Sequence, residues 1–138
     1  LTVEASGIAV AVLTAQYFGC PAVFAKKAKT SNISDDVYSA PVKSYTHNCI
    51  NQVMIEKKYL NPGDKVLVID DFLAHGEALT GLFKLIEDAG AEVVGAGIVI
   101  EKAFQAGGKD LRKRGFRIES LARISGMDAE TGSISFIN

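Results

Sequence analysis

The sequence predicts an α/β fold in which helices flank an open, mostly parallel sheet. The apolar run at residues 66–69 has the character of a strand buried on both faces of such a sheet, and the apolar run at 93–100 predicts another strand. The segment between them has helical periodicity, at the spacing of a right-handed strand–helix–strand unit. A chain of 138 residues, 48% of them hydrophobic, can bury a core without metal or disulfides. We therefore expect one domain over residues 1–138.

The chain begins with a strand, a helix and a second strand. Residues 1–3 resemble the end of a strand, so we expect the first elements of the fold to be missing from this chain. Apolar residues then recur at helical spacing from Ile8 to Phe18, and Gly19 and Pro21 end this amphipathic helix. The apolar residues 22–25 predict a short strand.

A long polar loop and a hairpin follow. The polar stretch 26–36 has a length usually associated with function or mobility. From Val37 to Ile55, β-branched, aromatic and polar residues roughly alternate around His47 and Asn48, which predicts two solvent-facing antiparallel strands. We expect a mobile loop and hairpin flap over about residues 27–56. The part from Lys27 to Val42 should become ordered when ligand binds.

The second half alternates strands and helices. Leu79, Leu82, Phe83 and Ile86 share one face of the helix between the two buried strands. Further elements are expected in order: a turn at 61–64, a solvated helix at 107–115, and strands at 118–124 and 133–137. Gly95 and Gly97 share a strand face, where we expect a covering helix to pack closely.

Charge and cysteine content exclude several classes of protein. Fifteen Lys and Arg against sixteen Asp and Glu give a net charge of −1, which leaves no overall field to hold a nucleic-acid backbone or an anionic membrane surface. The apolar runs are shorter than the ~18 residues of a membrane span. Cys20 and Cys49 lie in unrelated contexts, which indicates neither a disulfide framework nor a zinc site. Reduced thiols in a cytoplasmic protein are the expectation.

The richest chemistry follows the strand at 66–69. Asp70 and Asp71 suit a ligand with vicinal hydroxyls, bound directly or through a divalent cation. A small-residue loop then opens a helix, whose N–H groups and dipole suit a phosphate. The loop consists of Ala74, His75, Gly76, Glu77 and Ala78. Diol and phosphate together indicate ribose 5-phosphate, although the same residues would also serve simply to end a strand and form a turn.

The run from Val66 to Ala78 resembles the signature of the type I phosphoribosyltransferase family: four apolar residues, two acidic ones and a phosphate loop. The loop 74–78 is similar to the Ala-Asn-Gly-Gln-Ala loop of bacterial members that act on xanthine, with His75 and Glu77 in place of Asn and Gln. Other segments with the same resemblance are 2–9, 23–29, 98–105 and 118–124.

The resemblance implies a type I phosphoribosyltransferase fold and an enzyme of purine salvage. The enzyme would transfer the 5-phosphoribosyl group of 5-phosphoribosyl 1-pyrophosphate to xanthine, giving xanthosine 5'-monophosphate and pyrophosphate. Guanine and hypoxanthine are further candidate bases. Mg²⁺ would accompany the sugar pyrophosphate and pyrophosphate, without a metal site of the protein's own. A homodimer is also implied.

The resemblance assigns roles to residues at five places. Asp70 and Asp71 would act on the sugar as the catalytic pair, and loop 74–78 would bind its phosphate. The loop Ala5, Ser6 and Gly7 would hold pyrophosphate, with a simple helix N-cap as the alternative.

The basic stretch Lys26, Lys27 and Lys29 would also meet pyrophosphate, against the alternative of a solvated charge run. Lys102 would donate to an exocyclic purine oxygen while Phe104 packs near the ring. The alternative is a lysine extending to solvent beside a core phenylalanine.

A second function stays open at this point. Purine operon repressors of Gram-positive bacteria carry a similar domain that binds the sugar pyrophosphate as an effector without catalysis. The segment from Glu101 to Gln105 favours the enzyme, because a pure sensor does not need to recognise a base.

Overall fold

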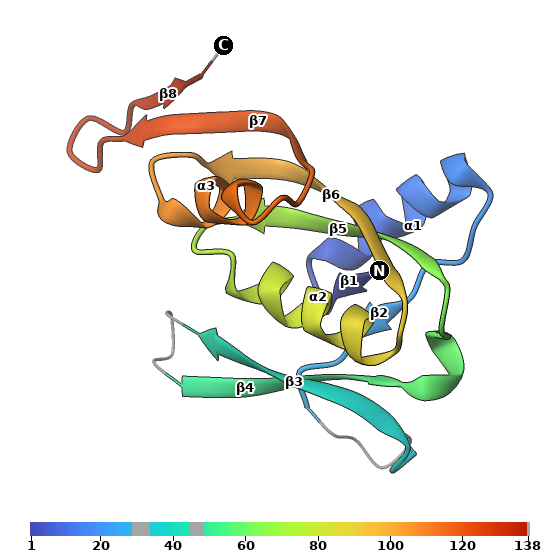
Figure 1. The fold of residues 1–138 in the computed structure, drawn as a ribbon. Coiled ribbons are helices and arrows are strands. Elements are labelled where there is room, and N and C mark those ends of the chain that lie inside the picture. The colour runs from blue at the N-terminus through green and yellow to red at the C-terminus, as the bar shows by residue number, and fades with distance from the viewer. Residues whose placement is uncertain (29–33, 45–48, 138) are drawn as a thin grey trace.

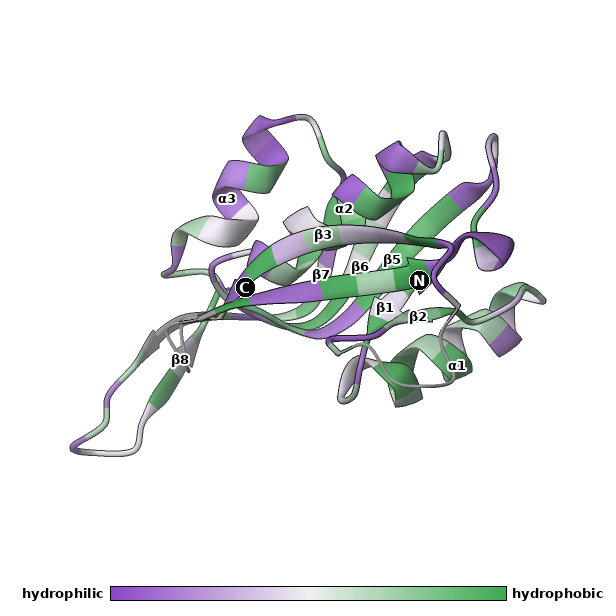
Figure 2. Ribbon diagram, turned by 90° about the horizontal axis from the view of Figure 1, so that it is seen from below, coloured by the Kyte–Doolittle hydropathy of each residue, from purple (hydrophilic) through white to green (hydrophobic). Residues whose placement is uncertain are grey.

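The computed structural model describes residues 1–28, 34–44 and 49–137 (Figure 1). Helix α1 lies on one side of the sheet, and α2 and α3 lie on the other (Figure 2). The elements in chain order are β1 (Thr2–Val3), α1 (Gly7–Phe18), β2 (Phe24–Ala25), β3 (Val37–Ser44), β4 (Cys49–Glu56), the 3-10 helix η1 (Lys57–Tyr59), β5 (Lys65–Leu73), α2 (Glu77–Asp88), β6 (Glu92–Lys102), α3 (Ala106–Lys113), β7 (Ile118–Met127) and β8 (Ile134–Phe136). The predicted α/β class is confirmed.

The order of the strands across the sheet reverses between β1 and β5. Strands β5, β6 and β7 run parallel in that order, with β8 antiparallel at the edge. Strand β1 pairs with β2 in parallel, and the Ile69 N–H donates to the Leu1 carbonyl at 2.8 Å, which places β1 beside β5. The chain thus leaves β1 toward one edge and leaves β5 toward the other. Ligands of open α/β sheets bind at such a switch point, beyond the carboxyl ends of the strands.

The core lies between the sheet and α2. The predicted helical face is buried there, with Leu79, Leu82, Phe83 and Ile86 at most 1% exposed. Burial of such side chains stabilises the fold by roughly 1.5–3 kcal/mol each. In α1 the buried residues are Gly7, Ala11 and Ala15, whereas Val12 and Phe18 of the predicted apolar face are exposed. Helix α3 buries Gly107, Gly108 and Leu111 and is therefore only partly solvated, contrary to expectation.

The predicted hairpin is present as β3 and β4, but only one of its faces meets solvent. Ala40, Val53 and Ile55 are buried, because this face packs against α2. The His47–Asn48 turn lies outside the described residues, as does part of the loop from Lys27 to Val42, whose mobility stays a prediction.

Two expectations about the central strands are wrong. Strand β5 continues to Leu73, so the acidic pair lies within the strand instead of following it. A covering helix does not explain the glycines of β6, because a side chain at Gly95 would meet the Arg117 backbone and one at Gly97 would meet Ile69. The register between β5 and β6 shifts at this point, because Val66 pairs with Val93 whereas Leu67 pairs with Gly95.

None of the helices in the described ranges has the length and apolar character needed to cross a membrane.

Candidate active site

The switch point brings together two of the predicted segments. The Ser6 hydroxyl donates to Asp71 Oδ1 at 3.0 Å, across 65 positions of the sequence. Ser6 precedes α1 but makes no side-chain capping bond, so the N-cap alternative does not describe its hydroxyl. A Cβ at Gly7 would collide with the Thr2 hydroxyl and lie 3.0 Å from Asp70 Oδ1. Glycine at this position therefore allows the loop to approach the acidic pair.

Asp70 and Asp71 have different surroundings. Asp70 is 5% exposed and accepts a hydrogen bond from the Asp71 N–H at 3.1 Å. Burial, and then the neighbouring Asp71 charge, raise the pKa of Asp70 to about 7. Asp71 is half-buried and bonded to Ser6. Near neutral pH Asp70 can therefore either donate or accept a hydrogen bond, which suits a sugar hydroxyl.

The phosphate loop leads from the end of β5 into α2. Gly76 adopts a positive φ of 84°, a conformation that favours glycine, and its carbonyl accepts from the Thr80 N–H at 2.9 Å. The N–H groups of the first turn of α2 follow directly and are suited to an anion. His75 is exposed, whereas Ala74, Glu77 and Ala78 are half-buried. Glu77 places a negative charge in this turn, which works against an anion there.

Lys102 lies at the end of β6, close to a residue that the sequence analysis did not assign. Its Nζ is 5.1 Å from the centroid of the Phe72 ring, a cation–π contact. Phe72 directly follows the acidic pair and is 39% exposed. Phe104 is 48% exposed and is therefore not the core residue of the alternative reading. Both rings are thus accessible near the predicted base contact. The position of Phe72 directly after Asp70 and Asp71 was the feature of the sequence that could have pointed to it.

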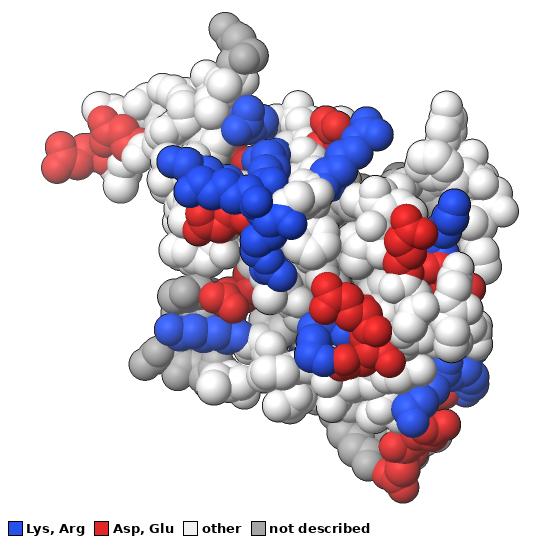
Figure 3. Space-filling view, viewed as in Figure 1, with Lys and Arg blue, Asp and Glu red and all other residues white. Residues whose placement is uncertain are grey.

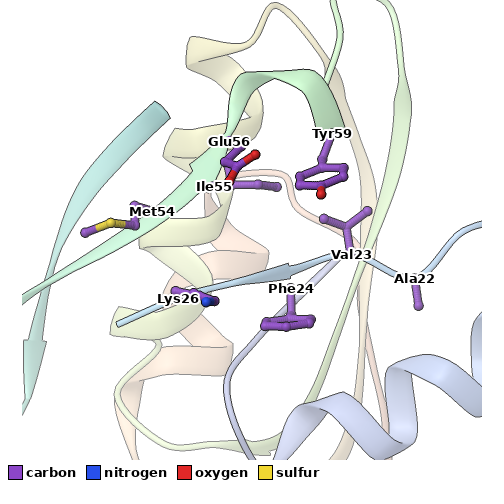
Figure 4. Close-up of a pocket in the computed structure, with 8 residues that line it drawn as sticks. All are labelled: Ala22, Val23, Phe24, Lys26, Met54, Ile55, Glu56 and Tyr59. Atoms are coloured by element: carbon purple, nitrogen blue, oxygen red, sulfur yellow. The ribbon is translucent and has the colours of Figure 1, made fainter. Parts of the chain in front are cut away.

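The two described lysines of the basic stretch lie in different surroundings. The Lys27 N–H donates to Glu4 Oε1 at 2.6 Å, and the charge of Lys27 lowers the pKa of Asp70 in opposition to burial. Lys26 exchanges two backbone hydrogen bonds with Met54 at 2.8 Å. Its side chain lines a groove of about 380 Å³ between β2 and β4 (Figure 4). The charge of Lys27 therefore acts on Asp70, while the Lys26 side chain lines the groove.

A buried ion cluster next to Lys102 was also missed by the sequence analysis. Glu101 is 1% exposed and accepts two bonds from Arg112 and one from Ser120, at 2.7, 2.7 and 2.6 Å. Arg123 Nε lies 3.3 Å from the same carboxylate. The hydrogen bonds from Arg112 lead in lowering the pKa of Glu101 to about 2. Lys and Arg side chains gather over this region of α3 and β7 (Figure 3). The sequence feature that could have revealed the cluster was Glu101, a single acidic residue at the end of an apolar strand.

In the described parts of the chain, no three His, Cys, Asp or Glu side chains gather in a way that could hold a metal ion.

Comparison with known proteins agrees with this architecture. The phosphoribosyl transferase domain model matches residues 1–126. A xanthine phosphoribosyltransferase of Lachnoclostridium phytofermentans is 52% identical over 136 residues, covering 99% of this chain and 70% of the relative. One of Latilactobacillus sakei is 51% identical over 138 residues, covering 100% of this chain and 70% of the relative.

Solved structures of adenine phosphoribosyltransferases share the fold. The structure from Thermoanaerobacter pseudethanolicus has a TM-score of 0.75 and 25% identity, covering 88% of this chain and 67% of that one. The structure from Giardia lamblia has a TM-score of 0.76 and 23% identity, covering 88% and 67%. With the match to the domain model and relatives at about half identity, the chain belongs to the phosphoribosyltransferase family.

Proposed function

We propose that this protein transfers the 5-phosphoribosyl group of 5-phosphoribosyl 1-pyrophosphate to xanthine in purine salvage, forming xanthosine 5'-monophosphate and pyrophosphate. The observation that carries the proposal is the Ser6–Asp71 hydrogen bond, which joins the predicted pyrophosphate loop to the predicted sugar site. The choice of xanthine is supported by the names of relatives that are 51–52% identical.

Each part of the site then has a task. Asp70 and Asp71 bind the ribose hydroxyls, and the N–H groups of loop 74–78 bind the 5-phosphate. The Ala5–Gly7 loop and Lys27 receive the pyrophosphate. Displacement at C1 develops positive charge on C1 and the ring oxygen. The acidic pair stabilises that charge, and the two loops position the sugar for attack by the base.

Mg²⁺ binds together with the sugar pyrophosphate, as part of the substrate. Asp70 and Asp71 offer oxygen donors of the kind Mg²⁺ prefers, but the described residues provide no complete ligand set. When bound, Mg²⁺ neutralises charge on the departing pyrophosphate.

The purine site is assigned to Lys102 and Phe104. Lys102 donates to an exocyclic oxygen, which xanthine, guanine and hypoxanthine all carry and adenine lacks. Phe104 supplies an exposed ring against which the base packs.

The repressor alternative is not favoured, because the relatives at about half identity are named as enzymes. We further propose that the protein is a homodimer in the cytoplasm. Cys20 is a free thiol, in keeping with a reducing compartment. Sedimentation velocity would measure the oligomeric state.

The test is nucleotide formation by the parent protein and by Lys102→Gln, with each purine in turn. Loss of the charge-assisted bond, worth about 1.5–3 kcal/mol, should lower kcat/KM roughly ten- to a hundredfold for oxygen-bearing purines. Affinity for the sugar pyrophosphate, measured by calorimetry, should hardly change.

Lys109→Gln, an exposed lysine of α3, is the control and should behave as the parent does. A parent that forms no nucleotide with any purine would reject the enzyme. A fully active Lys102→Gln variant would reject the role of Lys102 alone.

A further inference from the structure

We propose that α3 acts as a buttress for the phosphate loop, and that Gly107, Glu101 and Arg112 are positioning residues that set the affinity for the 5-phosphate of the sugar. This inference rests on the proposed function, because it assigns the phosphate to loop 74–78. None of the three residues needs to touch the substrate.

The first step is the contact between α3 and the loop. A Cβ added to Gly107 would collide with the Ala74 carbonyl oxygen and lie 2.5 Å from His75 C and 2.6 Å from Gly76 N. From the other side, a Cβ at Gly76 would lie 3.3 Å from Gly107 Cα. The backbones of loop and helix therefore meet directly, with no side chain between them. Backbone has little freedom to yield, so the position of α3 determines the position of the loop.

The second step is the attachment of α3 to the sheet. A Cβ at Gly108 would collide with Glu101 Oε1, so the residue after Gly107 in the same turn of the helix packs directly on this carboxylate. Arg112 clamps Glu101 through two bonds of 2.7 Å, and Arg112 Nη2 donates to the Ile118 carbonyl at 3.1 Å. Ser120 adds a bond to Glu101 from β7. The helix is thereby anchored to the ends of β6 and β7.

The two steps together form a chain of contacts from the rigid sheet to the phosphate loop. Anion binding by backbone N–H groups requires that these groups point at one place, and misplacement by a fraction of an ångström weakens it. The pyrophosphate loop, residues 5–7, contacts Asp70 and Asp71 instead of α3. The buttress should therefore affect the 5-phosphate and leave pyrophosphate binding unchanged.

The experiment measures binding of ribose 5-phosphate and of Mg²⁺-pyrophosphate, separately, by calorimetry. Gly107→Ala places a methyl group in the loop backbone, while alanine is a better helix former than glycine, so helix propensity alone should not weaken α3. We expect at least a tenfold loss of ribose 5-phosphate affinity with pyrophosphate affinity unchanged. In catalysis, the KM for the sugar pyrophosphate should rise while the KM for the purine stays constant.

Gly126→Ala is the matched control, since a Cβ there meets nothing within 4 Å. Arg112→Met and Arg112→Lys form a second pair that leaves the loop contact untouched. Methionine removes the clamp and should reproduce the selective loss, and lysine should restore part of it. This pair decides the matter if Gly107→Ala does not fold.

Unchanged ribose 5-phosphate affinity in folded variants would overturn the inference, as would equal losses for ribose 5-phosphate and pyrophosphate. A parent that binds ribose 5-phosphate but forms no nucleotide would overturn the proposed enzyme and leave the buttress standing. A parent that binds no ribose 5-phosphate would overturn the buttress as well.

Discussion

At the scale of single residues, the acidic pair shows how adjacent side chains of one type acquire different properties. Asp70 is buried within β5 and its pKa is raised to about 7, whereas Asp71 is half-buried and accepts the Ser6 hydroxyl. Burial disfavours the ionised form of Asp70, and the Asp71 charge adds to this effect. Such a group costs stability when it ionises, which is typical of residues kept for binding.

Asp71→Asn should weaken binding of the sugar pyrophosphate and leave the fold intact. The asparagine side chain has one oxygen and no charge, so it cannot replace the carboxylate toward the sugar hydroxyls. We expect roughly a tenfold loss or more in affinity by calorimetry, because a hydrogen bond to a charged group contributes about 1.5–3 kcal/mol. Unchanged affinity, or loss of the cooperative thermal transition, would contradict this assignment.

Asp70→Asn should change stability in a pH-dependent way. The folded-state pKa of about 7 lies above the ordinary value of 3.8, so folding takes up a proton between these values. Stability of the parent should therefore fall as the pH rises from about 4 to 7. Above pH 7 Asp70 is ionised in the folded protein and lowers its stability by the full amount. Asparagine has no charge and removes this loss of stability.

The measurement for Asp70→Asn is thermal unfolding at pH 5 and pH 8 without ligand. The gain in Tm of the variant relative to the parent should be larger at pH 8 than at pH 5. Asp110→Asn, an exposed aspartate of α3, is the control and should show no such difference. An equal gain at both pH values would argue against burial as the cause.

At the scale of secondary-structure elements, the hairpin of β3 and β4 depends on α2. Gly81 lies where a Cβ would collide with Val42 and would be 3.3 Å from Val53 Cγ2. The two elements thus approach closely because one residue of the helix has no side chain. The hairpin is also connected to the basic stretch, because Met54 of β4 forms an antiparallel bridge with Lys26.

Gly81→Leu should loosen the hairpin without unfolding the sheet. Overpacking of this contact should cost about 1–3 kcal/mol of stability. Amide hydrogen exchange should accelerate in β3 and β4 and stay slow in β5 and β6. Thr80→Leu, at an exposed position of the same helix, is the control. Faster exchange throughout the sheet would show that the hairpin is not a separable unit.

At the scale of the whole molecule, the Glu101 cluster joins β6, α3 and β7. The pKa of Glu101, about 2, lies below its ordinary value of 4.5, so its contribution to stability is present above 4.5 and lost as the pH falls toward 2. The difference corresponds to about 3 kcal/mol. Acid should therefore release α3 from the sheet.

Glu101→Gln should destabilise the protein by about 3–5 kcal/mol at pH 7, because it removes the buried carboxylate that accepts two hydrogen bonds from Arg112. The deficit relative to the parent should shrink as the pH approaches 2. Urea unfolding at pH 7 and pH 3 would measure it. Glu87→Gln, at an exposed position of α2, is the control and should have little effect. A deficit that is constant with pH would reject the electrostatic explanation.

The sequence by itself determined the order of elements and the chemistry of the central motif. These properties depend on local periodicity and on the identity of neighbouring residues, as for the α2 face of Leu79 to Ile86 and for Asp70 and Asp71. The resemblance of the 66–78 segment was sufficient to identify the family, and the match of the domain model to residues 1–126 confirms this identification.

Only the tertiary structure decided which distant residues meet. Three contacts join segments that are distant in the sequence, and no local pattern predicts them. They are the Ser6–Asp71 bond, the Lys102–Phe72 contact and the close approach of Gly76 to Gly107. Burial likewise depends on what packs over a residue, so one face of the predicted solvent-facing hairpin is covered by α2. Periodicity identifies an element, whereas the packing of elements against one another determines the environment of each side chain.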